Sequence, residues 1–343
     1  MSSGTIGTRM LKNSVIKHLE GIKVGQDFSV LEEDTSFSLI SAMGFSDISG
    51  PEGMTTGEVA LNRALNNLSL SGALIEGFKD SANRNIKISI SIVAGRNCEE
   101  QDLRSEMQKL SSFCKKQGIK IIGGNTAFSG EDKNYSVTIT AYGYTDRETL
   151  KQVKAHLTPG DKVIIIGNAG EYGANLLAEK CRDELMKRFS ESYIDENIKQ
   201  RFKIFSGDIA ALLIKNGASY IHDVSYGGIY RALQEISEYS SLGIQVEHES
   251  IPIRQSTIEV CEYLNINPYK IMGTGGLVAV CKQDKLKDVI NQLALYNDQT
   301  DKISFSEAGE LLQKKECIIF SERNKTRRSL TYYDEDSLFI FIH

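Results

Sequence analysis

The chain has 343 residues, more than a single hydrophobic core comfortably holds, so two domains are expected. Hydrophobic residues make up 41% and charged residues 25%, which is typical of a globular protein and not of a disordered or fibrous one. There are 40 basic and 45 acidic residues, a net charge of -5 and no long basic block, which argues against nucleic acid as a partner.

The sequence also argues against a membrane or secreted protein. No stretch carries 18 consecutive apolar residues, and the first ten residues lack the apolar core of a signal peptide. The six cysteines form no C-x-x-C pair, and we expect them to be reduced core residues of a cytoplasmic protein. They are Cys98, Cys114, Cys181, Cys261, Cys281 and Cys317.

The first 150 residues are predicted to form an α+β domain. Hydrophobic periodicity and turn residues define its elements. In chain order these are strands over 28–31 and 37–43, a helix over 55–72, a strand over 86–93, a helix over 103–118 that ends at a glycine, a short strand over 119–122 that ends at Gly123-Gly124-Asn125-Thr126, and a longer strand over 135–144.

The turn sequence Thr158-Pro159-Gly160-Asp161 marks the boundary of a second domain, and we predict domains over 1–150 and 151–343. The second domain alternates strands and helices. Its predicted elements are strands over 162–166, 218–221, 244–246 and 277–281, helices over 176–185, 209–214, 229–236, 257–264 and 286–293, and closing strands over 303–305, 317–320 and 338–342.

The segment from Ala218 to Gly228 is predicted to form a strand, a glycine turn and the start of a helix. The free N–H groups and the positive dipole end of such a helix favour an anion, commonly phosphate. Asp223 would repel that phosphate unless a divalent cation lay between them. The segment therefore indicates either a metal-phosphate site or a glycine turn in which Asp223 is a surface cap.

Familiar catalytic patterns do not account for the remaining glycines. Gly167, Gly170 and Gly173 follow a strand, but their spacing is not that of a dinucleotide fingerprint. The sequence contains no P-loop, H-E-x-x-H or G-x-S-x-G pattern. What remains is a set of glycine-containing turns, here called glycine corners, each with a polar side chain beside it. The side-chain oxygens belong to Asp27, Asn67, Asn125 and Asp223.

In their order along nearly the whole chain, these corners resemble the aminoimidazole ribonucleotide (AIR) synthetase superfamily of PurM-like proteins. Within it, the chain looks most similar to AIR synthase-related proteins of the HypE type, which act in hydrogenase maturation. The segments that carry the resemblance are Gly25-Gln-Asp27, Asn66-Asn-Leu-Ser-Leu-Ser-Gly72-Ala73, Ile121-Ile-Gly-Gly-Asn-Thr126, Pro159-Gly-Asp161 with Gly167 to Gly173, His222-Asp-Val-Ser-Tyr-Gly-Gly228, Gly243-Ile-Gln-Val246 with Ile251-Pro252, and Asn267-Pro268 with Gly275-Gly-Leu-Val278.

The resemblance implies a two-domain α/β (α+β) fold, in which the N-terminal domain binds ATP and dimerises through its β-sheet and the C-terminal domain is α/β. It implies ATP and Mg²⁺ as cofactors, a homodimer, and a small substrate whose oxygen is phosphorylated or activated at the dimer interface. Carried over by position, the nucleotide-binding residues are Asp27, Asn67, Gly123, Gly124, Asn125 and Thr126. The phosphate or substrate side is Gly170, Gly173, His222, Asp223, Gly227 and Gly228, and the metal ligands are Asp27 and Asp223, with Asn67 and Asn125 as weaker candidates.

The sequence departs from the family pattern at its acidic corners. Gln26 stands where members carry the first acid of Gly-Asp-Asp, and Asn67 and Asn125 replace aspartates of the next two corners. Ala42 stands where many members have a strand aspartate. An amide oxygen can coordinate a cation but adds no charge, so we expect weaker Mg²⁺ binding.

Two functions follow from the resemblance and its departures. The first is an ATP-dependent enzyme that phosphorylates or activates an oxygen of a small substrate. The alternative is a catalytically degenerate nucleotide- or ligand-binding relative with a regulatory role. A third interpretation, in which the glycine corners are only turns of a scaffold, remains beside them.

Overall fold

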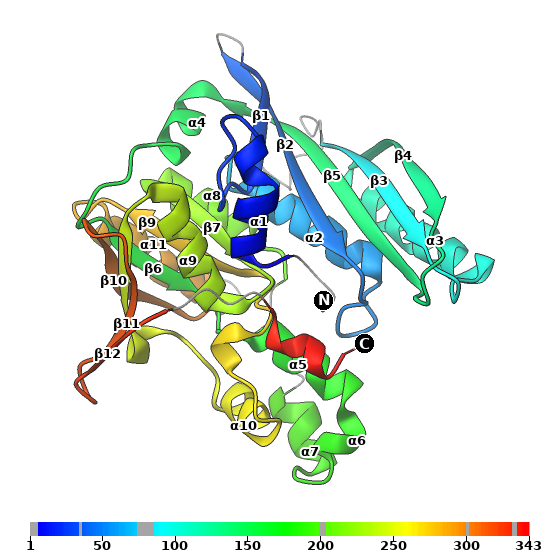
Figure 1. The fold of residues 1–343 in the computed structure, drawn as a ribbon. Coiled ribbons are helices and arrows are strands. Elements are labelled where there is room, and N and C mark those ends of the chain that lie inside the picture. Colours follow the sequence, from blue (N-terminus) through cyan, green and yellow to red (C-terminus); the bar gives the residue numbers. More distant parts are fainter. Residues whose placement is uncertain are drawn as a thin grey trace. The chain divides into compact units, whose positions relative to one another are not determined.

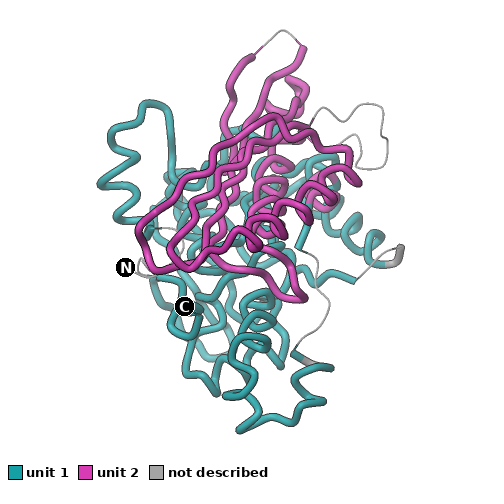
Figure 2. Tube along the Cα trace, turned by 90° about the vertical axis from the view of Figure 1, so that its right-hand side faces the viewer, with its two compact units in different colours: residues 1–26, 152–206, 212–343 teal, residues 27–151, 207–211 magenta. Residues whose placement is uncertain are grey.

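The computed structural model describes residues 6–33, 36–73, 86–198, 204–299, 302–330 and 335–342. It has a mixed α/β fold with two sheets, which confirms the predicted fold class (Figure 1). The chain divides into two compact units, coloured separately in Figure 2. Unit 1 comprises Met1–Gln26, Gln152–Ser206 and Leu212–His343, and unit 2 comprises Asp27–Lys151 and Gly207–Ala211.

Unit 2 is built on a five-stranded sheet in the order β1-β2-β5-β3-β4. Its strands are β1 (Phe28–Glu33), β2 (Phe37–Ser46), β3 (Lys87–Ala94), β4 (Lys120–Phe128) and β5 (Tyr135–Asp146), and its helices include α2 (Thr56–Ser69) and α3 (Glu100–Gln117). Only the β3–β4 pair is parallel. Alternate residues such as Ile40 and Ile139 are fully buried because α2 packs against β2 and β5.

The two long helices of unit 2 begin and end at the residue types that the sequence suggests. Thr55 and Glu58 form a capping box at the start of α2, in which each side chain accepts a hydrogen bond from the other residue's backbone N–H. Gly118 ends α3 in the left-handed conformation, with φ of 68°. The predicted boundaries of both helices thus reflect local capping chemistry.

Strand β4 is longer than the predicted strand over 119–122. The segment Gly123-Gly124-Asn125-Thr126, predicted as the turn that ends the strand, instead lies inside it and pairs with β3. A Cβ on Gly124 would lie 1.8 Å from the Ile90 carbonyl oxygen, so a glycine is needed for the close approach of the two strands. The predicted turn was therefore wrong, because the segment pairs with β3 and Gly124 allows the two strands to approach closely.

Unit 1 is built on a seven-stranded mixed sheet in the order β12-β11-β8-β10-β6-β9-β7. Its strands are β6 (Lys162–Ile166), β7 (Ala218–Val224), β8 (Gly243–Glu247), β9 (Gly276–Cys281), β10 (Phe305–Leu312), β11 (Cys317–Ser321) and β12 (Thr326–Ser329). Its helices are α1 (Thr8–Ser14), α5 (Glu171–Lys180), α6 (Arg182–Leu185), α7 (Glu191–Tyr193), α9 (Gly228–Ser240), α10 (Gln255–Tyr263) and α11 (Leu286–Gln299). Two further helices, α4 (Arg147–Val153) and α8 (Gly207–Lys215), contain residues of both units.

The core of unit 1 lies between its sheet and α9. Val163, Val278 and Val280 from the central strands pack in one buried cluster with Leu233 and Ile236 of α9. These helix residues lie three apart, on the face that the helical periodicity predicts as apolar. The burial of α9 fixes the position of its N-terminus at the end of β7.

The N-terminal segment packs with unit 1, although the predicted domain 1–150 placed it with the other half. Lys12 pairs with Glu238 of α9 at 2.8 Å, and Arg231 of α9 donates to the Ile6 carbonyl at 3.0 Å. These long-range contacts, which no local pattern reveals, explain why Met1–Gln26 groups with the later residues. The other end of the predicted domain lies one residue from the border between Lys151 and Gln152.

The end of the described chain also differs from its prediction. The segment 338–342, predicted as a strand, lies largely in the 3₁₀ helix Ser337–Ile340, whose Asp336 accepts the Leu338 N–H at 2.9 Å. That cap satisfies backbone donors locally and replaces strand pairing. The six cysteines are free, and Cys114, Cys261 and Cys281 are buried. None of the described helices is long and apolar enough to cross a membrane.

Candidate metal and nucleotide site

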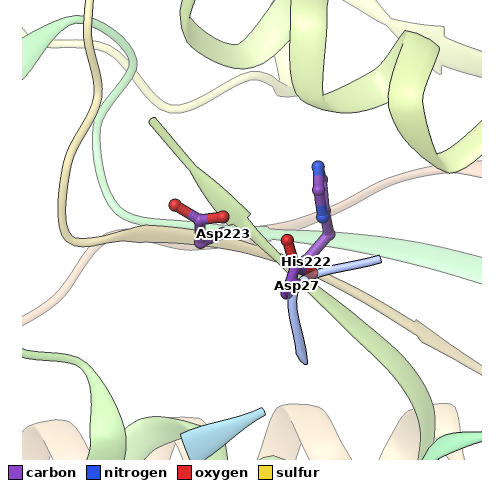
Figure 3. Close-up of side chains that lie close together, drawn as sticks. All are labelled: Asp27, His222 and Asp223. Carbon is purple, nitrogen blue, oxygen red and sulfur yellow. The ribbon is translucent and has the colours of Figure 1, made fainter. Parts of the chain in front are cut away.

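Three predicted site residues lie together near the end of β7. Asp27, His222 and Asp223 each offer a ligand atom, and these atoms lie within 4.8 Å of one another (Figure 3). His222 and Asp223 are consecutive residues of β7, and Asp27 directly follows Met1–Gln26, the segment that packs in the same unit as β7. His222 is 2% exposed, whereas both aspartates are half-buried.

The turn Gly25-Gln26-Asp27 is fixed against β7 and α9. The Tyr220 hydroxyl donates to the Gly25 carbonyl at 2.6 Å, and the Tyr220 ring stacks on Tyr239 with centroids 4.6 Å apart. Gly25 has φ of 79°, and a Cβ there would lie 2.6 Å from the backbone oxygen of Glu235. The position therefore requires glycine, and the tight turn brings Asp27 to His222.

A buried carboxylate from α9 holds the imidazole of His222. Glu235 Oε2 lies 3.1 Å from His222 Nε2, and Glu235 Oε1 accepts from Arg231 Nε at 2.9 Å. Burial raises the pKa of Glu235, but the hydrogen bond to His222 and the charge of Arg231 outweigh it and lower the pKa to about 2. Glu235 is thus ionised at neutral pH and acts only as an acceptor.

The three side chains fit a divalent cation. Two carboxylates and an imidazole form a donor set that suits Mn²⁺ and similar ions, and the carboxylates alone suit Mg²⁺. Gln26, which replaces the family's first acid, uses its side-chain oxygen to accept the Lys23 N–H at 3.3 Å. Its amide therefore stabilises the turn that carries Asp27.

The glycine turn after β7 accepts a carboxylate of the same chain. Gly227 is the N-cap of α9, and its N–H donates to Oδ2 of Asp336 at 2.8 Å. Phe339 stacks on Tyr226 of the turn with centroids 5.9 Å apart. A carboxylate at this position is favoured by the positive dipole end of α9, and in this structure it is the side chain of Asp336.

Three glycines predicted for the phosphate side pack against one segment, Pro268–Ile271. A Cβ on Gly170 would lie 2.5 Å from the Pro268 oxygen, and one on Gly228 would lie 2.5 Å from the Ile271 oxygen. A Cβ on Gly173 would lie 2.9 Å from the Ile271 side chain. Close packing of the backbone thus explains these glycines without a ligand.

The nucleotide-binding candidates of unit 2 lie on two of its elements. Asn67, near the end of α2, donates through Nδ2 to the Met43 carbonyl at 3.1 Å, while its buried Oδ1 has no hydrogen-bond partner among the residues that the structure describes. An acceptor in that state fits a ligand that supplies a donor or a cation. Gly123 to Thr126 lie on the exposed strand β4.

Sequence reasoning missed Glu235 and Asp336. Glu235 lies 13 residues after His222, and its only local signal is the i, i+4 pair with Arg231 on an otherwise buried helix. Asp336 lies 109 residues from its partner Gly227, and no periodicity connects them. Contacts of this kind are set by the tertiary fold.

The fold and this acidic corner define a protein of the AIR synthase class. Residues 30–145 match the N-terminal domain, and residues 158–311 the C-terminal domain, of AIR synthase related proteins. Together these matches cover most of the chain. The chain therefore belongs to the AIR synthase related family.

Curated relatives include hydrogenase maturation proteins. The carbamoyl dehydratase HypE of Rhizobium leguminosarum bv. viciae is 25% identical over 66% of this chain and 61% of its own length. A putative hydrogenase expression/formation protein of Methanocaldococcus jannaschii is 23% identical over 82% of each chain. The chain thus spans about three fifths of the length of the Rhizobium protein.

Solved structures of similar fold include a HypE-HypF complex, with a TM-score of 0.69 and 20% identity over 94% of this chain and 99% of the other. HypE in complex with ATP has a TM-score of 0.68 and 16% identity over 96% of both chains. A ThiL protein complexed with AMPPCP and TMP has a TM-score of 0.63 and 16% identity, over 95% of this chain and 96% of the other. These similarities establish the fold.

Proposed function

We propose that this protein is an ATP-dependent enzyme that activates an oxygen of a small substrate, with a divalent cation at Asp27, His222 and Asp223. The observation that carries the proposal is the convergence of these three donors. Similar proteins add support, since solved relatives hold ATP or AMPPCP and curated ones are named carbamoyl dehydratases. A carbamoyl group carries the type of oxygen that phosphorylation would activate.

In this proposal the residues of this chain bind the cation and the nucleotide and orient them. Asp27 and Asp223 supply negative charge, and a bound cation would neutralise the phosphates of the nucleotide. Asn67 Oδ1, which is buried and has no hydrogen-bond partner in the described part of the chain, and the exposed Asn125 and Thr126 on β4 would contact the nucleotide. Gly227 and Gly228 would serve the phosphate or substrate side.

A second function is favoured by one observation, the carboxylate of Asp336 on Gly227 N–H. A phosphate at the start of α9 would compete with this carboxylate. Together with the amides at Asn67 and Asn125, the arrangement suits a relative that binds a nucleotide or another ligand without turnover. That regulatory protein is the alternative to the enzyme.

We further propose that the protein is a homodimer assembled through the sheet of unit 2. Large apolar side chains are exposed on every strand of this sheet, and contiguous exposed apolar surface marks interaction sites. They are Leu31 on β1, Phe37 and Met43 on β2, Val93 on β3, Ile122 and Phe128 on β4 and Tyr144 on β5.

Thermal unfolding of the purified chain with ATP, in Mg²⁺ or in EDTA, tests the function. A ligand that binds only the native state raises the midpoint, so we expect a rise with ATP that depends on Mg²⁺, together with slow phosphate release. Asp27→Asn should reduce the Mg²⁺-dependent rise of the unfolding midpoint, because it removes one negative charge from the cluster of Asp27, His222 and Asp223. Asp284→Asn, at an exposed position, is the matched control.

The outcomes separate the two functions. A rise of equal size in Mg²⁺ and EDTA, without phosphate release, would favour the ligand-binding alternative. No rise with any nucleotide would contradict both the enzyme and a nucleotide-binding relative.

A further inference from the structure

The interactions of Glu235 link it to His222 and to the turn that carries Asp27. Its two carboxylate oxygens are divided between His222 Nε2 and Arg231 Nε. Its backbone oxygen packs against Gly25, two residues before Asp27. The side chains of His222, Arg231 and Glu235 are 3%, 8% and 18% exposed, so water competes little for these contacts.

The hydrogen bond fixes which nitrogen of His222 carries a proton. A carboxylate that also receives the Arg231 guanidinium is an acceptor, so His222 Nε2 must be the donor. In the neutral imidazole the lone pair then belongs to Nδ1, the nitrogen that ligates metals when Nε2 is protonated. In Figure 3 one ring nitrogen lies beside Asp27 and the other points away from it.

We propose that Glu235 is a positioning residue of the metal site, which holds Nε2–H of His222 so that Nδ1 faces the cation shared with Asp27 and Asp223. Histidines that ligate metals commonly donate their other N–H to a carboxylate, and loss of that partner weakens metal binding about 10- to 100-fold. The inference rests on the proposed cation site and does not require ATP turnover.

Arg231 completes the arrangement. Its Nε holds one oxygen of Glu235, and its NH2 group donates to the Ile6 carbonyl of the N-terminal segment at 3.0 Å. The carboxylate therefore cannot rotate freely toward another partner. With one oxygen held by Arg231, the second oxygen is directed to His222.

The test measures binding of Mn²⁺ alone, without nucleotide, by isothermal titration calorimetry and by the Mn²⁺ electron paramagnetic resonance signal. Glu235→Gln keeps the size of the side chain but leaves it with one acceptor oxygen. That oxygen cannot accept hydrogen bonds from both Arg231 and His222 in the wild-type arrangement. We expect it to weaken Mn²⁺ binding about 10-fold or more. The matched control is Glu238→Gln on the same helix, which removes a buried carboxylate that pairs with Lys12 and Lys315 at 2.8 and 2.9 Å.

Mn²⁺ affinity that is unchanged in Glu235→Gln, or reduced equally in Glu238→Gln, would overturn the proposal, as would a wild-type chain that does not bind Mn²⁺. ¹⁵N NMR of the wild-type imidazole gives a second test that needs no variant: we expect the Nε2–H tautomer, and an Nδ1–H tautomer would overturn the inference. Failure of the ATP-dependent function alone would leave both results intact, so the two proposals can fail separately.

Discussion

At the scale of the residue, Gly228 illustrates how packing and a ligand motif can require the same amino acid. It has φ of 64°, and a Cβ would lie 2.5 Å from the Ile271 oxygen and 2.7 Å from the Tyr269 oxygen. Both oxygens belong to the backbone, which cannot yield as a flexible side chain does. We therefore expect Gly228→Ala to destabilise unit 1 by about 3 kcal/mol or more.

Gly160→Ala is the control for the conformation alone, because Gly160 has φ of 89° and nothing within 4 Å of its Cβ position. It should cost about 1 kcal/mol. Denaturant unfolding monitored for unit 1 compares the two variants. Equal losses of stability would show that close packing on Tyr269 and Ile271 is not what requires glycine.

The same residues show why the site was only partly predictable. The family resemblance implies Asp27 and Asp223 as metal ligands and places His222 on the phosphate or substrate side, and the ligand atoms of all three lie within 4.8 Å of one another in the structure. The sequence does not reveal Glu235 or Asp336, which reach their partners through the packing of α9 and of the chain end. Short sequence motifs predict where the glycine turns lie, whereas tertiary contacts determine which side chains reach those turns.

At the scale of the element, the start of α2 depends on one buried side chain of α3. Glu106 is 1% exposed; its Oε1 accepts from the Thr55 hydroxyl at 2.6 Å and the Gly57 N–H at 3.2 Å, and its Oε2 accepts from the Tyr135 hydroxyl at 2.8 Å. We expect Glu106→Gln to destabilise unit 2 by about 1 to 3 kcal/mol, since an amide leaves at least one of these buried donors unsatisfied.

Thermal unfolding of unit 2 measures this effect, and Glu100→Gln on the same helix is its control. The Glu100 side chain is 85% exposed and pairs with Arg104 in solvent, so its loss should change stability by less than about 0.5 kcal/mol. If both variants unfold at the same temperature as the wild type, the hydrogen bonds of Glu106 do not stabilise α2.

Helix boundaries that are set by a local cap were predicted well, whereas strand ends that depend on pairing were not. Thr55 and Gly118 mark helix boundaries through capping, which depends on neighbours in the chain. The limits of β4 depend on pairing with β3, so Gly123 and Gly124 looked like a turn until their partner strand was in place. The chain end over 338–342 looked like a strand for the same reason.

At the scale of the whole molecule, the fold class followed from the order of the corners, while the assignment of the N-terminal segment did not. Residues 30–145 and 158–311 match the two family domains. Met1–Gln26 joins unit 1 through contacts with α9 that span more than 200 residues of sequence. Such contacts leave no periodic signal in the chain.

The proposed homodimer gives the last prediction at this scale. Met43 is 58% exposed on β2, next to the central strand β5, so Met43→Glu should leave the fold of one chain intact. If the exposed sheet face of unit 2 pairs with a second copy, light scattering of the wild type should give twice the 38.1 kDa mass of one chain. Met43→Glu should give the mass of one chain, because an unpaired charge buried in the interface is costly. Leu295→Glu on α11, a helix of unit 1 in which Leu295 is 48% exposed, should keep the wild-type mass. A wild-type monomer, or a dimer that persists in Met43→Glu, would contradict assembly through this face.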